Sequence, residues 1–203
     1  MKTLIIKYLP RGERSHTKKL LDAFLEEAKG QDIEILDIAE NLPDMFNPVS
    51  LIGYLQRNYG GQKLSDAEAK SLARMDEMTA QLKLADIVVL ATPMYNFSLP
   101  AAVKAWFDSV MLKGETWDMS PDGYKGLMTG KKALILMASG GVYEGDMSSW
   151  EHAMSLAKIE FQFMGFDEVK GLTISGANMD AKKLPEKVEK GKAEIKKIVE
   201  EWY

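Results

Sequence analysis

Apolar residues along this chain fall into short continuous runs that alternate with longer segments of helical period. The short runs cover 3–9, 33–38, 86–92, 132–139 and 169–175, and each is predicted to be a β-strand. Two of them, DIVVLAT (86–92) and KALILMAS (132–139), are almost wholly apolar, which is typical of strands covered on both faces of a sheet. The pattern therefore favours an α/β protein.

Segments with a helical period lie between the predicted strands and after the last one. The first helix is predicted to begin at Ser15 and to stop at Gly30. The second begins at Ser65, which can form a capping box with Glu68, and extends to Leu84. The remaining three helices are predicted over 100–111, 148–164 and 184–202.

Strands that alternate with helices predict a parallel sheet with helices on both faces. Because crossover connections are right-handed, a doubly wound sheet with the strand order 2-1-3-4-5 is expected, in one domain that spans residues 1–203. Residues 39–64 are rich in proline, glycine and asparagine and lack a sustained period, so they are predicted to form a long excursion. Ligands of such sheets bind beyond the carboxyl ends of the strands, where the loops 9–17, 93–97 and 139–143 are expected to meet.

Composition narrows the chemistry that these loops can perform. The chain has no cysteine, which excludes disulfides, thiolate nucleophiles and cysteine-bound zinc or iron–sulfur centres. The two histidines, His16 and His152, are too few and too far apart to predict a metal site. A net charge of −4 argues against nucleic acid as a partner. No apolar run approaches the ~18 residues that span a bilayer, and the start lacks a signal-peptide pattern, so we expect a cytoplasmic protein with no membrane partner.

The first loop places two hydroxyls, Ser15 and Thr17, where a helix opens. Free backbone N–H groups and the positive end of the helix dipole make such a position suitable for a phosphate. Ser15 can equally serve only as the helix N-cap. The chain has no G-x-x-x-x-G-K-S/T and no G-x-G-x-x-G motif, which disfavours a P-loop and the usual dinucleotide site.

The other two loops are suited to a flat ring. The tetrapeptide MYNF (94–97) ends an apolar strand, and Gly140, Gly141 and Tyr143 follow the next strand. Taken singly, Phe97 is expected to face the core under a Tyr95 lid, and the two glycines are compatible with an ordinary turn. Taken together, a phosphate position on one loop and a ring position on the other two indicate flavin mononucleotide (FMN).

The stretch PMYNFSLPAAVKAWFDSV (93–110) resembles the signature of the FMN-dependent NADH-azoreductases, a family of flavodoxin-like NAD(P)H:quinone oxidoreductases. The similarity extends over nearly the whole chain and includes GLMTGKKALILMASGG (126–141) and FMGFDEV (163–169). The resemblance implies a flavodoxin-like fold with FMN as cofactor and NADH or NADPH as co-substrate. It also implies a quinone or azo compound as acceptor, and a homodimer in which the partner subunit completes the pocket.

The resemblance further implies a role for each matching residue. The FMN phosphate is held by Ser15, His16 and Thr17; the isoalloxazine is lined by Met94, Tyr95, Asn96 and Phe97; its pyrimidine edge is reached by Ser139, Gly140 and Gly141. Tyr143 is a candidate catalytic donor to the N1–C2=O edge of the flavin.

Two positions depart from the family pattern. Leu9 stands at the end of the first strand, where the family often has a serine that touches the phosphate, and Arg11 or Arg14 is a candidate replacement. Met119 stands where the family often has a substrate-facing tyrosine, which leaves azo reduction open.

The expected reaction is a two-electron hydride transfer with ping-pong order, in which the flavin carries the chemistry. One alternative is a flavodoxin-type single-electron carrier without its own small-molecule substrate, which a stable semiquinone would reveal. Another is a flavin-binding sensor without turnover.

Overall fold

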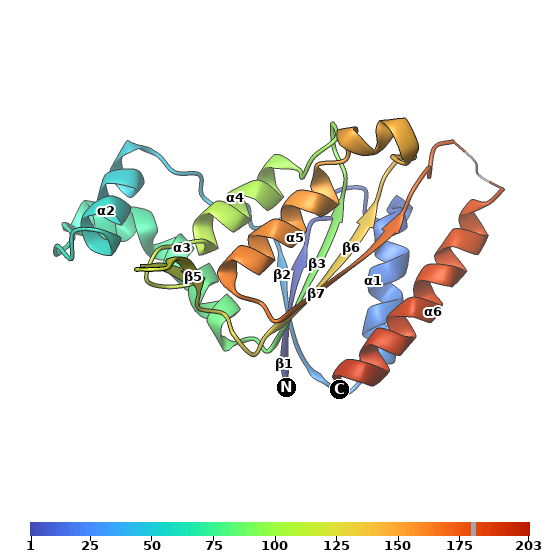
Figure 1. Cartoon of the computed structure of the whole chain (residues 1–203), viewed down its shortest axis with the longest axis horizontal. Helices are drawn as coiled ribbons and strands as arrows, with labels where there is room; N and C mark the ends of the chain where they lie inside the picture. Colours follow the sequence, from blue (N-terminus) through green and yellow to red (C-terminus); the bar gives the residue numbers. More distant parts are fainter. Residues whose placement is uncertain (180–181) are drawn as a thin grey trace.

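The computed structural model describes residues 1–179 and 182–203. Its centre is a five-stranded sheet in which neighbouring strands are all parallel (Figure 1). The strands are β1 (Lys2–Lys7), β2 (Asp32–Asp37), β3 (Ile87–Pro93), β6 (Lys132–Ala138) and β7 (Glu168–Ile174). They lie in the order β2-β1-β3-β6-β7, which confirms the expected order 2-1-3-4-5 in chain sequence.

Helices cover both faces of this sheet, and each face has its own apolar core (Figure 1). One face packs against α1 (His16–Glu27) and α6 (Leu184–Trp202). The other packs against α3 (Asp66–Leu84), α4 (Ala101–Val110) and α5 (Ala153–Met164). Every residue from 87 to 92 in the central strand β3 is buried, as its apolar sequence predicts. The two termini lie together at the end of the sheet opposite the carboxyl ends of the strands (Figure 1).

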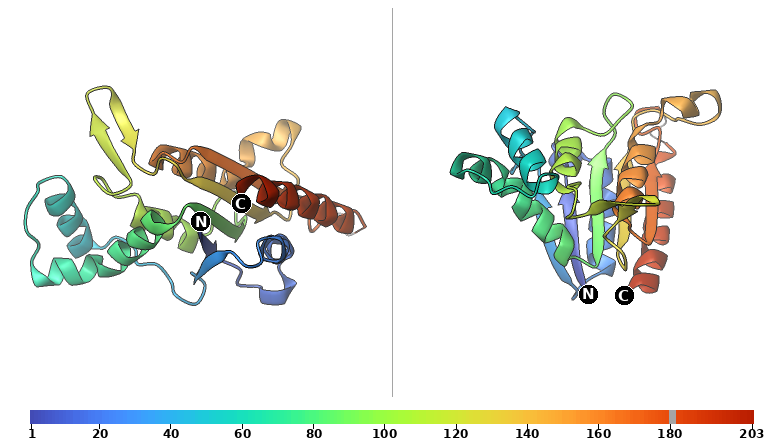
Figure 2. Two further views of the ribbon diagram at one scale, coloured as in Figure 1. Left: turned by 90° about the horizontal axis from the view of Figure 1, so that it is seen from below. Right: turned by 60° about the vertical axis from the view of Figure 1, so that its left-hand side comes forward.

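The excursion between β2 and α3 contains a helix, α2 (Pro48–Asn58), which was not predicted. The side chain of Asn47 caps it by accepting from the backbone N–H of Val49 and Ser50, and Pro48 occupies the first turn. Figure 2 shows that α2 projects beside the sheet, where it contacts α3. Its buried residues are Ser50, Gly53 and Tyr54, whereas its aliphatic residues are exposed, so the aliphatic positions do not mark the buried face.

A two-stranded antiparallel hairpin, β4 (Trp117–Ser120) and β5 (Gly123–Gly126), was also not predicted. The helix expected over 148–164 begins only at Ala153, because 145–150 form a short 3-10 helix, η2. A second 3-10 turn, η1 (Gly12–Arg14), precedes α1. Within the described ranges, no helix is long and apolar enough to cross a membrane.

The base of the hairpin lies directly against the C-terminal end of α5. The N–H of Met128 donates to the carbonyl of Met164 at 2.8 Å. A Cβ added at Gly126 would lie 2.3 Å from the backbone nitrogen of Gly165, which itself has a φ of 93°. Two glycines are therefore needed for this backbone-to-backbone contact.

We expect Gly126→Ala to lower the free energy of unfolding by about 1–3 kcal/mol, because backbone must move to admit the methyl group. Gly171→Ala in β7 is the matched control. Its nearest atom, 2.4 Å away, is the sulfur of Met154, the far end of a flexible side chain that can rotate aside. Urea titration of both variants measures the difference, and equal costs would contradict the rigid contact at Gly126.

Candidate functional site

The loops after β1, β3, β6 and β7 are held together by backbone hydrogen bonds that continue the sheet beyond its strands. The N–H of Tyr8 donates to the carbonyl of Ala91 at 2.9 Å, and that of Met94 donates to Ala138 at 2.9 Å. The N–H of Ser139 donates to Ile174 at 3.0 Å. The predicted meeting of three loops at this edge is therefore extended by a fourth loop, which follows β7.

A cavity of about 220 Å³ lies where these loops meet the start of α1, and we call it the α1 cavity. Its lining residues come from all four loops: Arg11, Ser15, His16, Thr17, Pro93, Met94, Tyr95, Ala138, Ser139, Gly140, Ala177 and Asn178. Seven of the predicted site residues are among them. The other four are Asn96, Phe97, Gly141 and Tyr143, which lie close by in sequence to residues that do line it.

The two predicted hydroxyls differ in what they can offer a ligand. Ser15 is the N-cap of α1, and its Oγ accepts from the N–H of Lys18 at 3.4 Å, so its own proton remains free to donate. Thr17 is fully buried, and its hydroxyl donates to the carbonyl of Thr92 at 3.3 Å. Only Ser15 therefore combines capping with a hydroxyl that can turn toward the cavity.

The electrostatics of the α1 cavity favour an anion. Arg11 contributes a permanent positive charge, and no described lining residue is a carboxylate. The first N–H groups of α1 add the positive end of a helix dipole. Of the two arginines considered as replacements for the serine that Leu9 displaces, Arg11 lines the cavity and Arg14 does not. Leu9 itself is buried in the core shared with α1 and α6.

The MYNF tetrapeptide forms a tight turn with an unusual backbone. Tyr95 and Ser98 exchange two backbone hydrogen bonds of 3.0 Å, and the two residues between them, Asn96 and Phe97, have φ values of 46° and 70°. Positive φ at both central positions is the pattern of a type I′ turn, which glycine and asparagine adopt most easily. A phenylalanine in this conformation is strained, and strain of this kind concentrates at functional sites.

The turn exposes its aromatic rings. Phe97 is 41% exposed and Tyr95 is 38% exposed, so the expectation that Phe97 faces the core under a Tyr95 lid is wrong. Phe97 instead stands edge to face with Trp150 at 5.3 Å and Tyr143 at 6.1 Å between ring centres. The N–H of His152 donates to the carbonyl of Phe97 at 2.8 Å and ties the turn to the start of α5. The turn therefore presents a fixed aromatic surface beside the cavity.

A second cavity, of about 270 Å³, continues from the first and shares Met94 and Ser139 with it. Tyr143 lines this second cavity. At the junction, a Cβ added to Gly140 would lie 2.6 Å from Nδ2 of Asn178, the end of a side chain from the loop after β7. Asn178 and Ala177 were missed from the sequence, since no motif marks the loop after the last strand; only its pairing with 139–141 brings it to the site.

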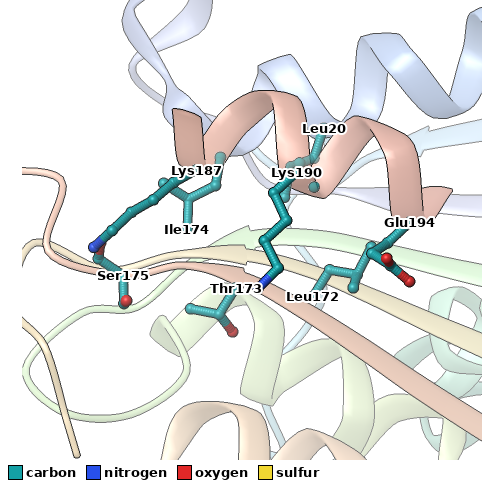
Figure 3. Close-up of a pocket in the computed structure, with 9 residues that line it drawn as sticks. Leu20, Leu172, Thr173, Ile174, Ser175, Lys187, Lys190 and Glu194 are labelled. Carbon is teal, nitrogen blue, oxygen red and sulfur yellow. The ribbon is translucent and has the colours of Figure 1, made fainter. Parts of the chain in front are cut away.

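A separate cavity of about 260 Å³ lies between α6 and β7, and no predicted site residue lines it (Figure 3). Its lining side chains come from α1, β7 and α6: Leu20, Leu172, Ile174, Lys187, Lys190 and Glu194. Nζ of Lys187 donates to the carbonyl of Ser175 at 2.7 Å, just past the end of the outermost strand. Cationic side chains commonly cover the open edge of a sheet, so Lys187 has a structural explanation here. Because this cavity holds no predicted site residue, we locate the candidate site at the α1 cavity.

Comparison with known proteins agrees with this geometry. Residues 1–199 match the family described as Flavodoxin-like fold. The chain is 34% identical over 203 residues to an FMN-dependent NADH:quinone oxidoreductase of Shewanella loihica, covering 98% of each chain. It is 35% identical over 193 residues to FMN-dependent NADH:quinone oxidoreductase 2 of Bacillus licheniformis, covering 91% of this chain and 92% of that one.

Solved structures give the same result. The azoreductase AzrA superposes over 100% of both chains with a TM-score of 0.91 and 27% identity. An FMN-dependent NADH-azoreductase from Bacillus anthracis, in complex with FMN, superposes over 98% of both chains with a TM-score of 0.87 and 26% identity. The chain therefore belongs to the flavodoxin-like fold family, and its resemblance to the azoreductase and quinone oxidoreductase branch is confirmed.

The strain at residue 97 can be tested with a pair of variants. Phe97→Gly and Phe97→Ala both remove the ring, but only glycine adopts positive φ without cost. We expect the glycine variant to be more stable than the alanine variant by about 1–2 kcal/mol. At an ordinary position the order is reversed by about 0.5–1 kcal/mol. Thermal and urea unfolding of both proteins give the sign, and a more stable alanine variant would contradict the left-handed turn.

Proposed function

We propose that this chain is an FMN-dependent NAD(P)H:quinone oxidoreductase that transfers two electrons to quinones or azo compounds. The observation that carries the proposal is the α1 cavity, an anion-favouring hollow that opens beside the exposed aromatic surface of Tyr95 and Phe97. The names of the relatives, which combine FMN, NADH and quinone reduction, support the same activity. Because those names specify NADH, we propose NADH rather than NADPH as the co-substrate.

The residues present fit FMN at both of its ends. A phosphate requires positive charge and N–H donors, which Arg11, the free hydroxyl of Ser15 and the start of α1 provide. A flavin ring requires a flat apolar surface and close backbone, which the turn at 94–97 and Gly140 provide. When bound, FMN supplies the capacity to accept a hydride from a nicotinamide and to pass two electrons to an acceptor.

The roles of the chain's own residues follow from this arrangement. The phosphate is held by Ser15, His16 and Thr17, with Thr17 acting through its backbone N–H because its hydroxyl is used by Thr92. The ring is flanked by Met94, Tyr95, Asn96 and Phe97, and Ser139, Gly140 and Gly141 approach its polar edge. The hydroxyl of Tyr143 donates to negative charge that develops at that edge. The site lies at the switch point of what we take to be a doubly wound sheet in one domain.

We propose a ping-pong order for the two substrates, because one opening beside Tyr95 and Phe97 accepts one flat ring at a time. The purified protein is expected to be yellow and to release FMN on denaturation. Initial rates with NADH at several quinone concentrations should give parallel double-reciprocal lines. Intersecting lines would show a ternary complex, and a stable semiquinone without NADH oxidation would instead indicate a single-electron carrier.

Ser15 and Thr17 are expected to respond oppositely to loss of the hydroxyl. Ser15→Ala should weaken FMN binding by about 10- to 150-fold, since a hydrogen bond to a charged partner contributes about 1.5–3 kcal/mol. Thr17→Val should leave FMN affinity nearly unchanged and lower stability by about 0.5–1.5 kcal/mol, because it removes only the internal bond to Thr92.

Riboflavin is the control ligand for this pair because it lacks the phosphate. Fluorescence titration of the apoprotein with FMN and riboflavin, with a thermal melt of each variant, separates the two effects. Equal weakening of both ligands by Ser15→Ala would place the phosphate elsewhere.

We also propose that the protein is a homodimer that meets its second copy through α2. Four apolar side chains of this helix, Val49, Leu51, Ile52 and Leu55, are between 44% and 50% exposed. Such a cluster on one projecting helix is a common mark of an interface. A cytoplasmic location is proposed as well, since the nicotinamide co-substrate is available there.

The dimer proposal predicts that Ile52→Glu shifts the protein toward monomers, because it would bury a charge at the interface. Leu84→Glu places the same charge at an exposed apolar residue at the end of α3 and should leave the assembly intact. Sedimentation velocity at several protein concentrations measures both variants. A wild-type monomer, or a dimer unaffected by Ile52→Glu, would contradict the use of α2.

A further inference from the structure

His16 is the one titratable imidazole at the α1 cavity, and it occupies the first position of α1. Its Nδ1 is buried and has no hydrogen-bond partner among the described residues. An imidazolium has two N–H donors, so protonation would leave one of them buried without an acceptor. The geometry therefore favours the neutral ring in the protein alone.

The charges around His16 act in the same direction. Burial lowers the pKa of His16 below its usual range, and the positive charges of Lys19 and Arg11 lower it further. Lys19 lies on α1 itself, and Arg11 lies in the turn before it. From the turn after β3, Tyr95 also lines the cavity; its pKa is raised by burial and by the neighbouring Tyr8, against the influence of Arg11, so it stays neutral near pH 7. Asn178, from the loop after β7, is uncharged.

We propose that binding of a phosphate monoester at the α1 cavity draws a proton from solvent onto the imidazole of His16. The inference rests on the proposed function, since FMN is the phosphate ester concerned. A dianion beside the ring supplies the opposite charge that the imidazolium requires. Arg11 is then the permanent cation of the phosphate site, and His16 is a cation that forms only with the ligand.

The direction of the resulting pH dependence is fixed by this proton. A negative charge within about 4–6 Å raises the pKa of an imidazole by roughly 1–3 units, because it favours the protonated form. FMN affinity should therefore fall, by up to about tenfold per pH unit, between the pKa of His16 in the free protein and its pKa in the complex, and should level off above the second value. Riboflavin affinity should not follow this course. Below about pH 6 the phosphate itself becomes protonated, so the informative range lies above that value.

Calorimetry tests the proposal without any measurement of activity. The full-length protein, stripped of flavin, is titrated with FMN at pH 7 in Pipes and in imidazole buffers of equal ionic strength. The two buffers differ in ionisation enthalpy, so the difference in heat counts the protons exchanged. We expect uptake of roughly half a proton or more per FMN.

Three comparisons make the outcome decisive. His16→Gln keeps a polar side chain and should abolish the uptake while FMN still binds. His152→Gln removes the other histidine of the chain and should leave the uptake unchanged. Riboflavin should bind to the wild type with no uptake.

Each alternative outcome has a distinct meaning. FMN binding without proton uptake, or with the same uptake in His16→Gln, overturns this inference and leaves the proposed function standing. Failure of the wild type to bind either FMN or riboflavin overturns the proposed function itself, and the inference with it. Because the chain has two histidines, proton NMR of their ring signals gives an independent check. The signal lost in His16→Gln should titrate at higher pH in the FMN complex than in the apoprotein.

Discussion

The backbone hydrogen bonds that continue the sheet past the ends of its strands are the interaction on which this site depends. Three such bonds, between residues 8 and 91, 94 and 138, and 139 and 174, fix the position of each loop relative to its neighbour. These bonds bring the residues of the separate loops to one cavity. The buried central strand β3 anchors the series because it pairs on both sides, with β1 and with β6.

Much of this fold follows from the sequence because its strands are short, apolar and separated by helices with clear starts. The order of the sheet needed only the handedness of crossovers, and the cap at Ser65 is present as predicted, with its N–H donating to Glu68 at 2.7 Å. The elements that escaped prediction lie outside the sheet. The helix α2 buries Ser50, Gly53 and Tyr54 rather than an aliphatic stripe, although Asn47 and Pro48 mark its start. The hairpin has strands of four residues, and its Pro-Asp-Gly turn at 121–123 was the only local signal.

The candidate site could be predicted only where a single loop carries a recognisable motif. Ser15 and the tetrapeptide at 94–97 stand at strand ends that a motif can mark. Asn178 does not, because its place at the cavity comes from pairing with the loop at 139–141. The hydrogen bonds of a hydroxyl cannot be predicted from such a motif either. Ser15 and Thr17 look alike in sequence, yet Ser15 only accepts a bond, from Lys18, whereas Thr17 donates to the carbonyl of Thr92. Conformation shows the same limit, since nothing in the letters Asn-Phe requires two left-handed residues in succession.

The contact between Phe97 and Trp150 has an optical consequence. Of the four tryptophans in the chain, Trp106 and Trp202 are buried, whereas Trp150 is 49% exposed and rests against the turn that borders the site. The indole of Trp150 is thus an intrinsic fluorophore. A ring that binds against Phe97 would change the polarity of the indole's surroundings and the quenching of its emission. Occupancy of the pocket can accordingly be followed through the protein's own emission, with no label attached and with colourless ligands as readily as with coloured ones.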